Sequence, residues 1–422
     1  MYDWANSVYS LVITSTIFPV YYNSVTTSPD GNEVVSFFGI SVVNTVLYSY
    51  SLSFSFLLIA ILSPLLSGIA DYGGQKKNFM KFFTYLGGIC CIGLFFFRGE
   101  YVEYGILASV FASIGFAGSL VFYNAFLPEI TTNERADMVS AKGYALGYIG
   151  SVILLLINLF MLGNPSFFGF EGEGMAARTS FLMVGIWWIG FAQIPFYYLP
   201  DNPYNRRPGS KFLKKGYQEL KNVWKSLKQL IQLQRFLLSF FFYSVGVQTV
   251  MLLAATFGNK ELRLPGDKLI LTILIIQVVA IFGSYLFAKI SSIKGNKFSL
   301  ILMILIWILI CISAYFVTTE YQFYALAFVV GMVMGGIQAL SRSTYSKIIP
   351  ENAIAHASYF SFYDVLEKLS IVLGTFSYGL IEQITGSMRN STLVLALFFI
   401  IGIVFLSKMH MSKHKAVSKV NA

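Results

Sequence analysis

Long apolar stretches alternate with short polar segments along almost the whole 422-residue chain. An apolar stretch of about 20 residues is the length of a helix across a ~30 Å hydrocarbon layer. Backbone polar groups inside a bilayer have to bond within their own segment, so we expect these stretches to be helices. The pattern predicts an all-α polytopic membrane protein with twelve spans, at residues 6–23, 45–70, 79–97, 104–126, 139–162, 179–199, 235–257, 269–290, 298–317, 322–346, 356–382 and 391–409.

The longest polar segment divides these spans into two sets of six. We expect a first six-helix bundle at 1–199, a basic cytoplasmic linker at 200–234, a second bundle at 235–409 and a cytoplasmic tail at 410–422. Apolar residues recur at helical spacing inside the linker, with lysines between them: Phe212, Leu220, Val223, Trp224, Leu227 and Ile231. The pattern favours an amphipathic helix on the inner membrane surface, and a partner-binding helix is the alternative.

The two sets also resemble each other weakly, as an internal repeat would. The connection between spans 2 and 3 contains the segment 71–77, and the connection between spans 8 and 9 contains the segment 292–297. If Gly74 is set on Gly295, Lys76 aligns with Lys297. The repeat predicts two pseudo-symmetric bundles.

Composition and charge support this interpretation. The chain is 56% hydrophobic and only 12% charged, with a net charge of +10. Of the 30 Lys and Arg residues, 23 fall in the even-numbered connections and the tail, and six fall on the opposite side. This asymmetry predicts a multi-pass cell-membrane protein with both termini in the cytoplasm. The basic excess thus orients the chain in a lipid bilayer and does not indicate a nucleic-acid partner.

Motifs for enzymatic chemistry are missing from the sequence. It contains no phosphate-binding Gly-x-x-x-x-Gly-Lys-Ser/Thr loop, no His-Glu-x-x-His pair and no Gly-x-Ser-x-Gly elbow. We therefore expect no enzyme activity, no cofactor and no bound metal. His356 is interpreted as a solvated loop residue.

Ionisable residues inside spans are rare and costly, so each is a candidate for function. Asp364, Glu367 and Lys368 share one face of the eleventh span. They can bind a proton or a zwitterionic solute, or form a structural ion pair. Arg342 in the tenth span can hold a carboxylate, lock against Asp364 in one state, or anchor the helix at the lipid headgroups. Gln338 lies one turn deeper and is expected to face a cavity.

Two lone amides and a glycine motif are further candidates. Asn124 in the fourth span and Gln248 in the seventh can bond a solute or a neighbouring helix. Gly143, Gly147 and Gly150 permit close helix packing in the fifth span.

The chain resembles the major facilitator superfamily in the loop after its second span. Ala70, Asp71, Gly74 and Lys76 match that signature, while Ser67, Tyr72 and Gln75 depart from it. The chain is also similar to the vacuole-effluxer-like branch, also called unknown major facilitator. The residues that carry this similarity are Tyr2-Asp3-Trp4-Ala5-Asn6-Ser7, Tyr243-Ser244-Val245-Gly246-Val247-Gln248-Thr249, Gly335-Gly336-Ile337-Gln338-Ala339-Leu340-Ser341-Arg342-Ser343, and Phe362-Tyr363-Asp364-Val365 with Lys368.

The resemblance implies site residues as well as a fold. It implies that the first helix lines a central cavity with Asp3, Trp4, Asn6 and Tyr9, although an acid at a helix start and an interfacial Trp are also ordinary features. It implies a cytoplasmic gate formed by Asp71, Gly74 and Lys76. The glycine motif resembles that of antiporters, with Tyr148 in place of its proline. Members of the branch usually have residues before the Tyr-Asp-Trp motif, so we expect a short amino terminus.

The resemblance further implies transport by alternating access between two six-helix bundles. Related fungal proteins are associated with amino-acid efflux from the vacuole. We therefore expect a monomeric secondary transporter that moves a small polar solute, such as an amino acid, coupled to protons through Asp364, Glu367 or Asp3. The alternative is a membrane sensor or scaffold that keeps the fold without transport, and a membrane enzyme is a weaker option.

Overall fold

The computed structural model describes residues 1–28, 30–31, 33–202, 212–350 and 353–410. Within these ranges, ten helices are long and apolar enough to cross a membrane. They are α3 (Asn44–Gly73), α4 (Lys76–Gly93) with η2 (Leu94–Phe96), α5 (Val102–Asn124), α7 (Ala136–Gly163), α8 (Glu173–Tyr198), α10 (Ile231–Leu262), α11 (Gly266–Lys294), α12 (Asn296–Phe316), α13 (Glu320–Ile348) and α15 (Met388–Ser407). Two further segments, the charged helix α14 (His356–Thr385) and the segmented first helix, complete the twelve spans. The predicted all-α fold is confirmed.

The first span is one continuous rod with a change of helix type inside it. It consists of α1 (Tyr2–Val8), the π-helical segment η1 (Tyr9–Thr16) and α2 (Ile17–Thr26). Two hydroxyls in η1 donate to carbonyls five residues earlier, Ser15 to Ser10 at 2.9 Å and Thr16 to Leu11 at 2.6 Å. This step is that of a π-helix, a form that often occurs at functional sites.

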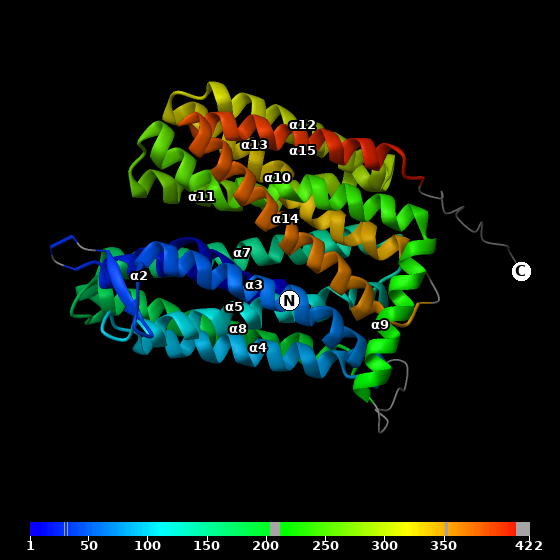
Figure 1. Ribbon diagram of the computed structural model, residues 1–422, viewed down its shortest axis with the longest axis horizontal. Coiled ribbons are helices and arrows are strands. Elements are labelled where there is room, and N and C mark those ends of the chain that lie inside the picture. The colour runs from blue at the N-terminus through cyan, green and yellow to red at the C-terminus, as the bar shows by residue number, and fades with distance from the viewer. Residues whose placement is uncertain (29, 32, 203–211, 351–352, 411–422) are drawn as a thin grey trace, which may run out of the picture.

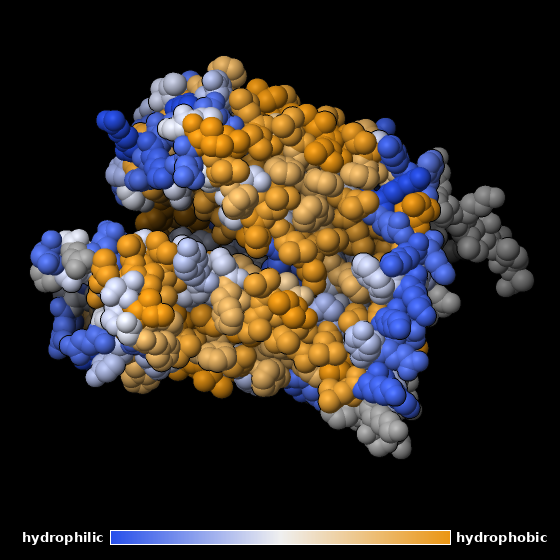
Figure 2. All heavy atoms as spheres, viewed as in Figure 1, coloured by the Kyte–Doolittle hydropathy of each residue, from blue (hydrophilic) through white to orange (hydrophobic). Residues whose placement is uncertain are grey.

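The helices form two halves that meet at one end only. The first half contains the helices up to α8, and the second contains α10 to α15 (Figure 1). Between the halves, α14 packs on α3, and α11 and α13 pack on α7. Figure 2 shows an apolar belt across the visible face of both halves and a hollow between them at one end. The structure is therefore open at this end and closed at the other.

The helix α9 (Phe212–Gln229) lies across the closed end, which we call the α9 end. The predicted linker helix is present, but it stops at Gln229, and Ile231 already belongs to α10. Residues 203–211 of the predicted linker and 411–422 of the predicted tail lie outside the described ranges.

The open end carries a β-hairpin that the pattern of apolar stretches did not predict. Strands β1 (Val34–Phe37) and β2 (Ile40–Val43) pair antiparallel, joined by Phe38 and Gly39. Both turn residues have positive φ, 50° and 82°, which matches the tight turn of a two-residue hairpin. The Phe38 amide donates to Glu103 at 3.2 Å, which ties the turn to α5. Short helices α6 (Leu127–Ile130) and η3 (Pro165–Phe168) lie in two other connections.

Candidate functional site

A buried ion pair connects the two halves. Arg342 of α13 places Nη1 3.3 Å from Oδ1 of Asp3 in α1. The same guanidinium donates to the side-chain oxygen Oδ1 of Asn124 at 3.3 Å and, from Nε, to the Ser140 hydroxyl at 3.0 Å. Tyr123 donates its hydroxyl to the other oxygen of Asp3. Every partner of Arg342 in this network comes from the first half, so the arginine joins the halves.

This arrangement differs from two of the roles considered for Arg342. Its side chain is only 4% exposed, so it does not reach lipid headgroups. Its carboxylate partner in this state is Asp3 and not Asp364. The guanidinium also stacks on Tyr144, 4.4 Å from the ring centre, a residue that the sequence analysis did not select. An arginine with its charge paired and its face on an aromatic ring is stable at a buried position.

The three candidate glycines of α7 all face the first helix. A side chain at Gly143 would collide with the Asp3 carboxylate, one at Gly147 with the Ser7 hydroxyl, and one at Gly150 with the Trp4 backbone. The absence of side chains on this face lets α1 approach α7 closely. Asp3 thereby reaches the contact between the halves.

The other candidates of the first helix do not join Asp3 at the contact. Trp4 stacks on Trp187 of α8 with ring centres 5.4 Å apart. Tyr9 is buried inside the first half, where its hydroxyl lies 2.8 Å from the Ser113 hydroxyl. Asn6 is also buried, and its Nδ2 has no hydrogen-bond partner among the described residues.

A second charged group lies on α14, where Asp364 and Lys368 are buried. The Lys368 ammonium is 3.0 Å from Asp364 Oδ1 and 3.3 Å from Glu367 Oε2. Gln248 of α10 donates to Glu367 at 3.0 Å. The ammonium lies 5.7 Å from the centre of the Phe56 ring on α3, in the other half. The predicted triplet therefore forms one cluster at the contact between the halves, and we call it the α14 triplet.

Gln338 also bridges the two halves. Its amide oxygen accepts from the Tyr148 hydroxyl of α7 at 2.5 Å, and its amide nitrogen lies 3.4 Å from the Met251 sulfur. Tyr148 is the residue that replaces the antiporter proline. It supplies the hydroxyl of this contact, so α7 contributes more than close packing.

At the α9 end, Asp71 of α3 contacts the start of α14 and joins the two halves. Its carboxylate accepts from the backbone amides of Ala357 at 3.2 Å and Ser358 at 2.7 Å, and from the Ser358 hydroxyl at 2.7 Å. A carboxylate at a helix N-terminus satisfies free amides and meets the positive end of the helix dipole. Gly74 ends α3 in a left-handed conformation with φ 67°, and a side chain there would collide with Asn202.

Lys76 and His356 meet at Glu129, close to the Asp71 contact. Lys76 of α4 forms an ion pair with Glu129, and His356 Nδ1 lies 3.0 Å from Oε1 of Glu129. Burial alone would raise the pKa of Glu129, but the His356 hydrogen bond and the Lys76 charge outweigh it and hold this pKa below its usual range. His356 is 5% exposed, so its interpretation as a solvated loop residue is wrong. The packing of α14 against the first half buries it.

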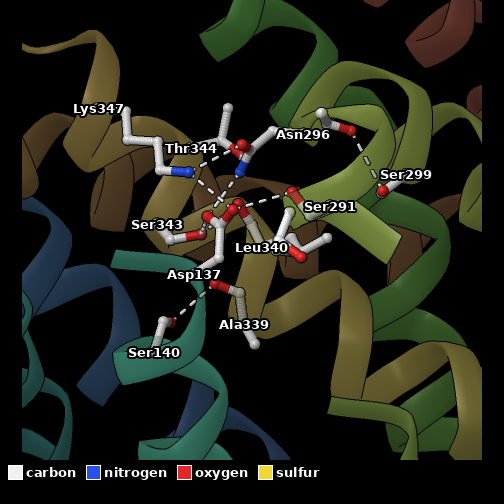
Figure 3. Close-up of polar contacts among 12 residues, drawn as sticks. Asp137, Ser140, Ser291, Asn296, Ser299, Ala339, Leu340, Ser343, Thr344 and Lys347 are labelled. Carbon is white, nitrogen blue, oxygen red and sulfur yellow. Dashed lines mark hydrogen bonds and ion pairs between the residues drawn. The ribbon is translucent and has the colours of Figure 1, made fainter. Parts of the chain in front are cut away.

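A network around Asp137 closes the other side of the α9 end (Figure 3). Asp137 lies in the first turn of α7 and accepts from the hydroxyls of Ser343 at 2.7 Å and Ser291 at 2.9 Å. It also accepts from the Asn296 amide at 2.7 Å, and the Lys347 ammonium lies 2.7 Å away. One buried carboxylate of the first half thus contacts α11, α12 and α13 of the second. We call this group the Asp137 network.

The sequence analysis missed the Asp137 network because its signal is ordinary. An acid in the first turn of a helix is already explained by the helix dipole. Only the spatial approach of Ser291, Asn296 and Ser343, 154 to 206 residues away, distinguishes it. Among the described residues, no group of three or more His, Cys, Asp or Glu side chains is placed to hold a metal ion.

We predict that Asp3→Asn or Arg342→Gln alone lowers the thermal stability of the purified protein, because each leaves a buried charge without its partner. Breaking a buried pair in this way costs about 3–5 kcal/mol. The double variant should be more stable than the sum of the two losses implies, which a double-mutant cycle of unfolding midpoints measures. Additive losses would contradict a direct interaction.

We also predict that Asp137→Asn opens the α9 end, because Lys347 then loses its charged partner. Hydrogen–deuterium exchange should become faster at the α9 ends of α7 and α13 and stay unchanged at their opposite ends. Glu171→Gln, at an exposed position near the open end, is the matched control. Exchange in Asp137→Asn equal to that of the control would show that the network does not hold this end closed.

Comparison with known proteins places this geometry in a family. Residues 1–419 match the family model described as vacuole effluxer Atg22 like. The chain is 33% identical to an uncharacterized MFS-type transporter, YxiO, of Bacillus subtilis, over 96% of this chain and 92% of the relative. It is 24% identical to autophagy-related protein 22 of Eremothecium gossypii, over 87% and 78% of the two chains.

A solved structure agrees in fold. The major facilitator superfamily transporter FucP, in the outward conformation, matches with a TM-score of 0.71 at 12% identity, over 97% of each chain. The helix arrangement, the opening between two halves at one end, and the family match along nearly the whole sequence agree with one another. The chain belongs to the vacuole effluxer Atg22-like family of major facilitator superfamily transporters.

Proposed function

We propose that the protein carries a small zwitterionic solute, such as an amino acid, across the membrane by alternating access. The observation that carries this proposal is the α14 triplet, a group of two carboxylates and one ammonium at the contact between the halves. Buried charges are costly and are rarely retained in a membrane span without a use. A solute with one positive and one negative group complements both signs of the triplet.

Partial exposure supports a binding role for part of this group. Glu367 has a side chain that is 25% exposed, whereas Asp364 is 3% exposed. Glu367, with Gln248 beside it, can therefore meet a solute amino group. Lys368 can turn from Glu367 to a solute carboxylate and keep Asp364 as its partner. Gln338 and Tyr148 add neutral hydrogen-bonding groups on the facing helices.

Asp364 is the residue that we assign to proton coupling. Its Oδ1 faces Lys368, and its buried Oδ2 has no hydrogen-bond partner among the described residues. A proton on this oxygen removes one negative charge from the triplet and so weakens its attraction for a solute amino group, and a bound amino group in turn disfavours the proton. Proton and solute binding are coupled in this way.

We further propose that the α9 end faces the cytoplasm in the cell membrane and that the protein acts as an exporting monomer. The excess of Lys and Arg on this side supports the orientation. The description of the matching family as effluxers supports the direction of transport. The structure open at the opposite end is then the state that releases solute outside.

The first test is solute flux in liposomes that contain the purified protein. We expect a pool of labelled amino acids to be transported faster than in protein-free liposomes, and a proton gradient should drive this flux. Flux that equals the protein-free value for every solute would instead support a sensor or scaffold that keeps the fold. Flux that ignores the gradient would exclude proton coupling.

The second test is Asp364→Asn, which removes the proposed proton site and keeps the side-chain shape. We expect gradient-driven flux to fall by tenfold or more, while exchange of labelled for unlabelled solute continues. Asp267→Asn, at an exposed position on α11, is the matched control and should keep wild-type flux. Unchanged gradient-driven flux in Asp364→Asn would remove this residue from the coupling mechanism.

A further inference from the structure

The helix α9 docks on both halves of the molecule at once. Its Gly216 lies so close to Gly68 and Ile69 of α3 that a side chain at Gly216 or Gly68 would collide with backbone. Toward the second half, the Tyr359 hydroxyl donates to the Ser226 hydroxyl at 3.0 Å. The α9 end cannot open without loss of one of these contacts, because α3 and α14 would have to separate.

The docked face uses only part of the helix, and a second apolar stripe stays uncovered. Val223 and Leu227, on the docked face of α9, are buried. Leu213, Tyr217 and Trp224, on the same helix, are 58%, 60% and 49% exposed. At 100° per residue these three side chains fall within an arc of about 40°. Trp224 also lies beside Phe362 of α14, with ring centres 5.5 Å apart, so the stripe adjoins the body of the protein.

A row of lysines runs beside this stripe. Lys214, Lys221, Lys225 and Lys228 are spaced by seven, four and three residues and fall within an arc of about 60°. All four are exposed. Figure 2 shows hydrophilic residues gathered along α9, next to the edge of the apolar belt. We call the four lysines and the three apolar residues the α9 outer face.

The position and chemistry of this face select its partner. An apolar stripe with lysines along one side matches the boundary of a bilayer, where acyl chains meet headgroups. Juxtamembrane lysines attract anionic headgroups more strongly than zwitterionic ones. The face also lies at the edge of the apolar belt, which a bilayer would cover.

We propose that the α9 outer face is a binding site for anionic phospholipid headgroups, and that their binding holds the α9 end closed. The lipid fixes α9 at the membrane surface, where it spans α3 and α14. A membrane rich in anionic lipid then favours the state that is open at the opposite end. Solute transport is not needed for this proposal, so it stands independently of the proposed function.

The test is native mass spectrometry of the full chain in detergent with phosphatidylglycerol or phosphatidylcholine. The wild-type protein should retain phosphatidylglycerol preferentially. We expect phosphatidylglycerol to bind at least about tenfold more weakly to the α9 variant, Lys214→Gln/Lys221→Gln/Lys225→Gln/Lys228→Gln. The matched control, Lys142→Gln/Lys289→Gln/Lys294→Gln/Lys408→Gln, removes the same charge from exposed lysines elsewhere and should bind as the wild type does.

A second measurement addresses the closed end. In nanodiscs, phosphatidylglycerol should slow hydrogen–deuterium exchange at the α9 ends of α13 and α14 in the wild type and in the control, but not in the α9 variant. Equal loss of binding in both quadruple variants would assign the effect to overall charge and overturn the proposal. A third outcome is that the protein binds a soluble polyglutamate peptide and shows no preference between phosphatidylglycerol and phosphatidylcholine. This would indicate an acidic protein partner and would also overturn the proposal.

Discussion

Charged side chains that are buried between the two halves need partners there, and this requirement determines how the halves meet. The guanidinium of Arg342 would lose several kcal/mol of hydration in this position without compensation. Asp3 neutralises it, and Asn124 and Ser140 take its other hydrogen bonds. Because all of these partners belong to the first half, the arginine of the second half can be buried only when the halves are closed. If the halves separated here, water would reach both charges, so neither would be left in hydrocarbon.

The two charged groups differ in how they respond to such a movement. Asp364, Glu367 and Lys368 all lie on α14, so their ion pairs persist whichever way the halves move. The pair of Asp3 and Arg342 has one member on each half and must break. The first arrangement is therefore independent of how the halves meet, whereas the second exists only while they are in contact.

Two contacts close the α9 end, and they differ in which helix supplies the acid. Asp71 of α3 meets the start of α14 in the second half. In the repeat, the position of Asp71 corresponds to Ser292, which carries no charge. The acid of the second contact comes instead from Asp137 at the start of α7, and α11 and α12 supply the hydroxyl and the amide. Each contact therefore has one acid from the first half, at opposite sides of the same interface.

The sequence by itself determined the twelve helices and the charge asymmetry along the chain. Both are local properties: the length of an apolar run decides whether it can span a bilayer, and the position of lysines does not depend on packing. It also indicated that Asp364, Glu367 and Lys368 share a face, because residues three and four apart on a helix are neighbours. Only the tertiary structure decided that Arg342 pairs with Asp3, that His356 is buried against Glu129, and that Asp137 enters the second half. These partners are 154 to 339 residues apart in the sequence. The residues around a charged side chain do not indicate which distant residue it will pair with. The packing of the two halves selects the partner, because burial makes every unpaired charge costly.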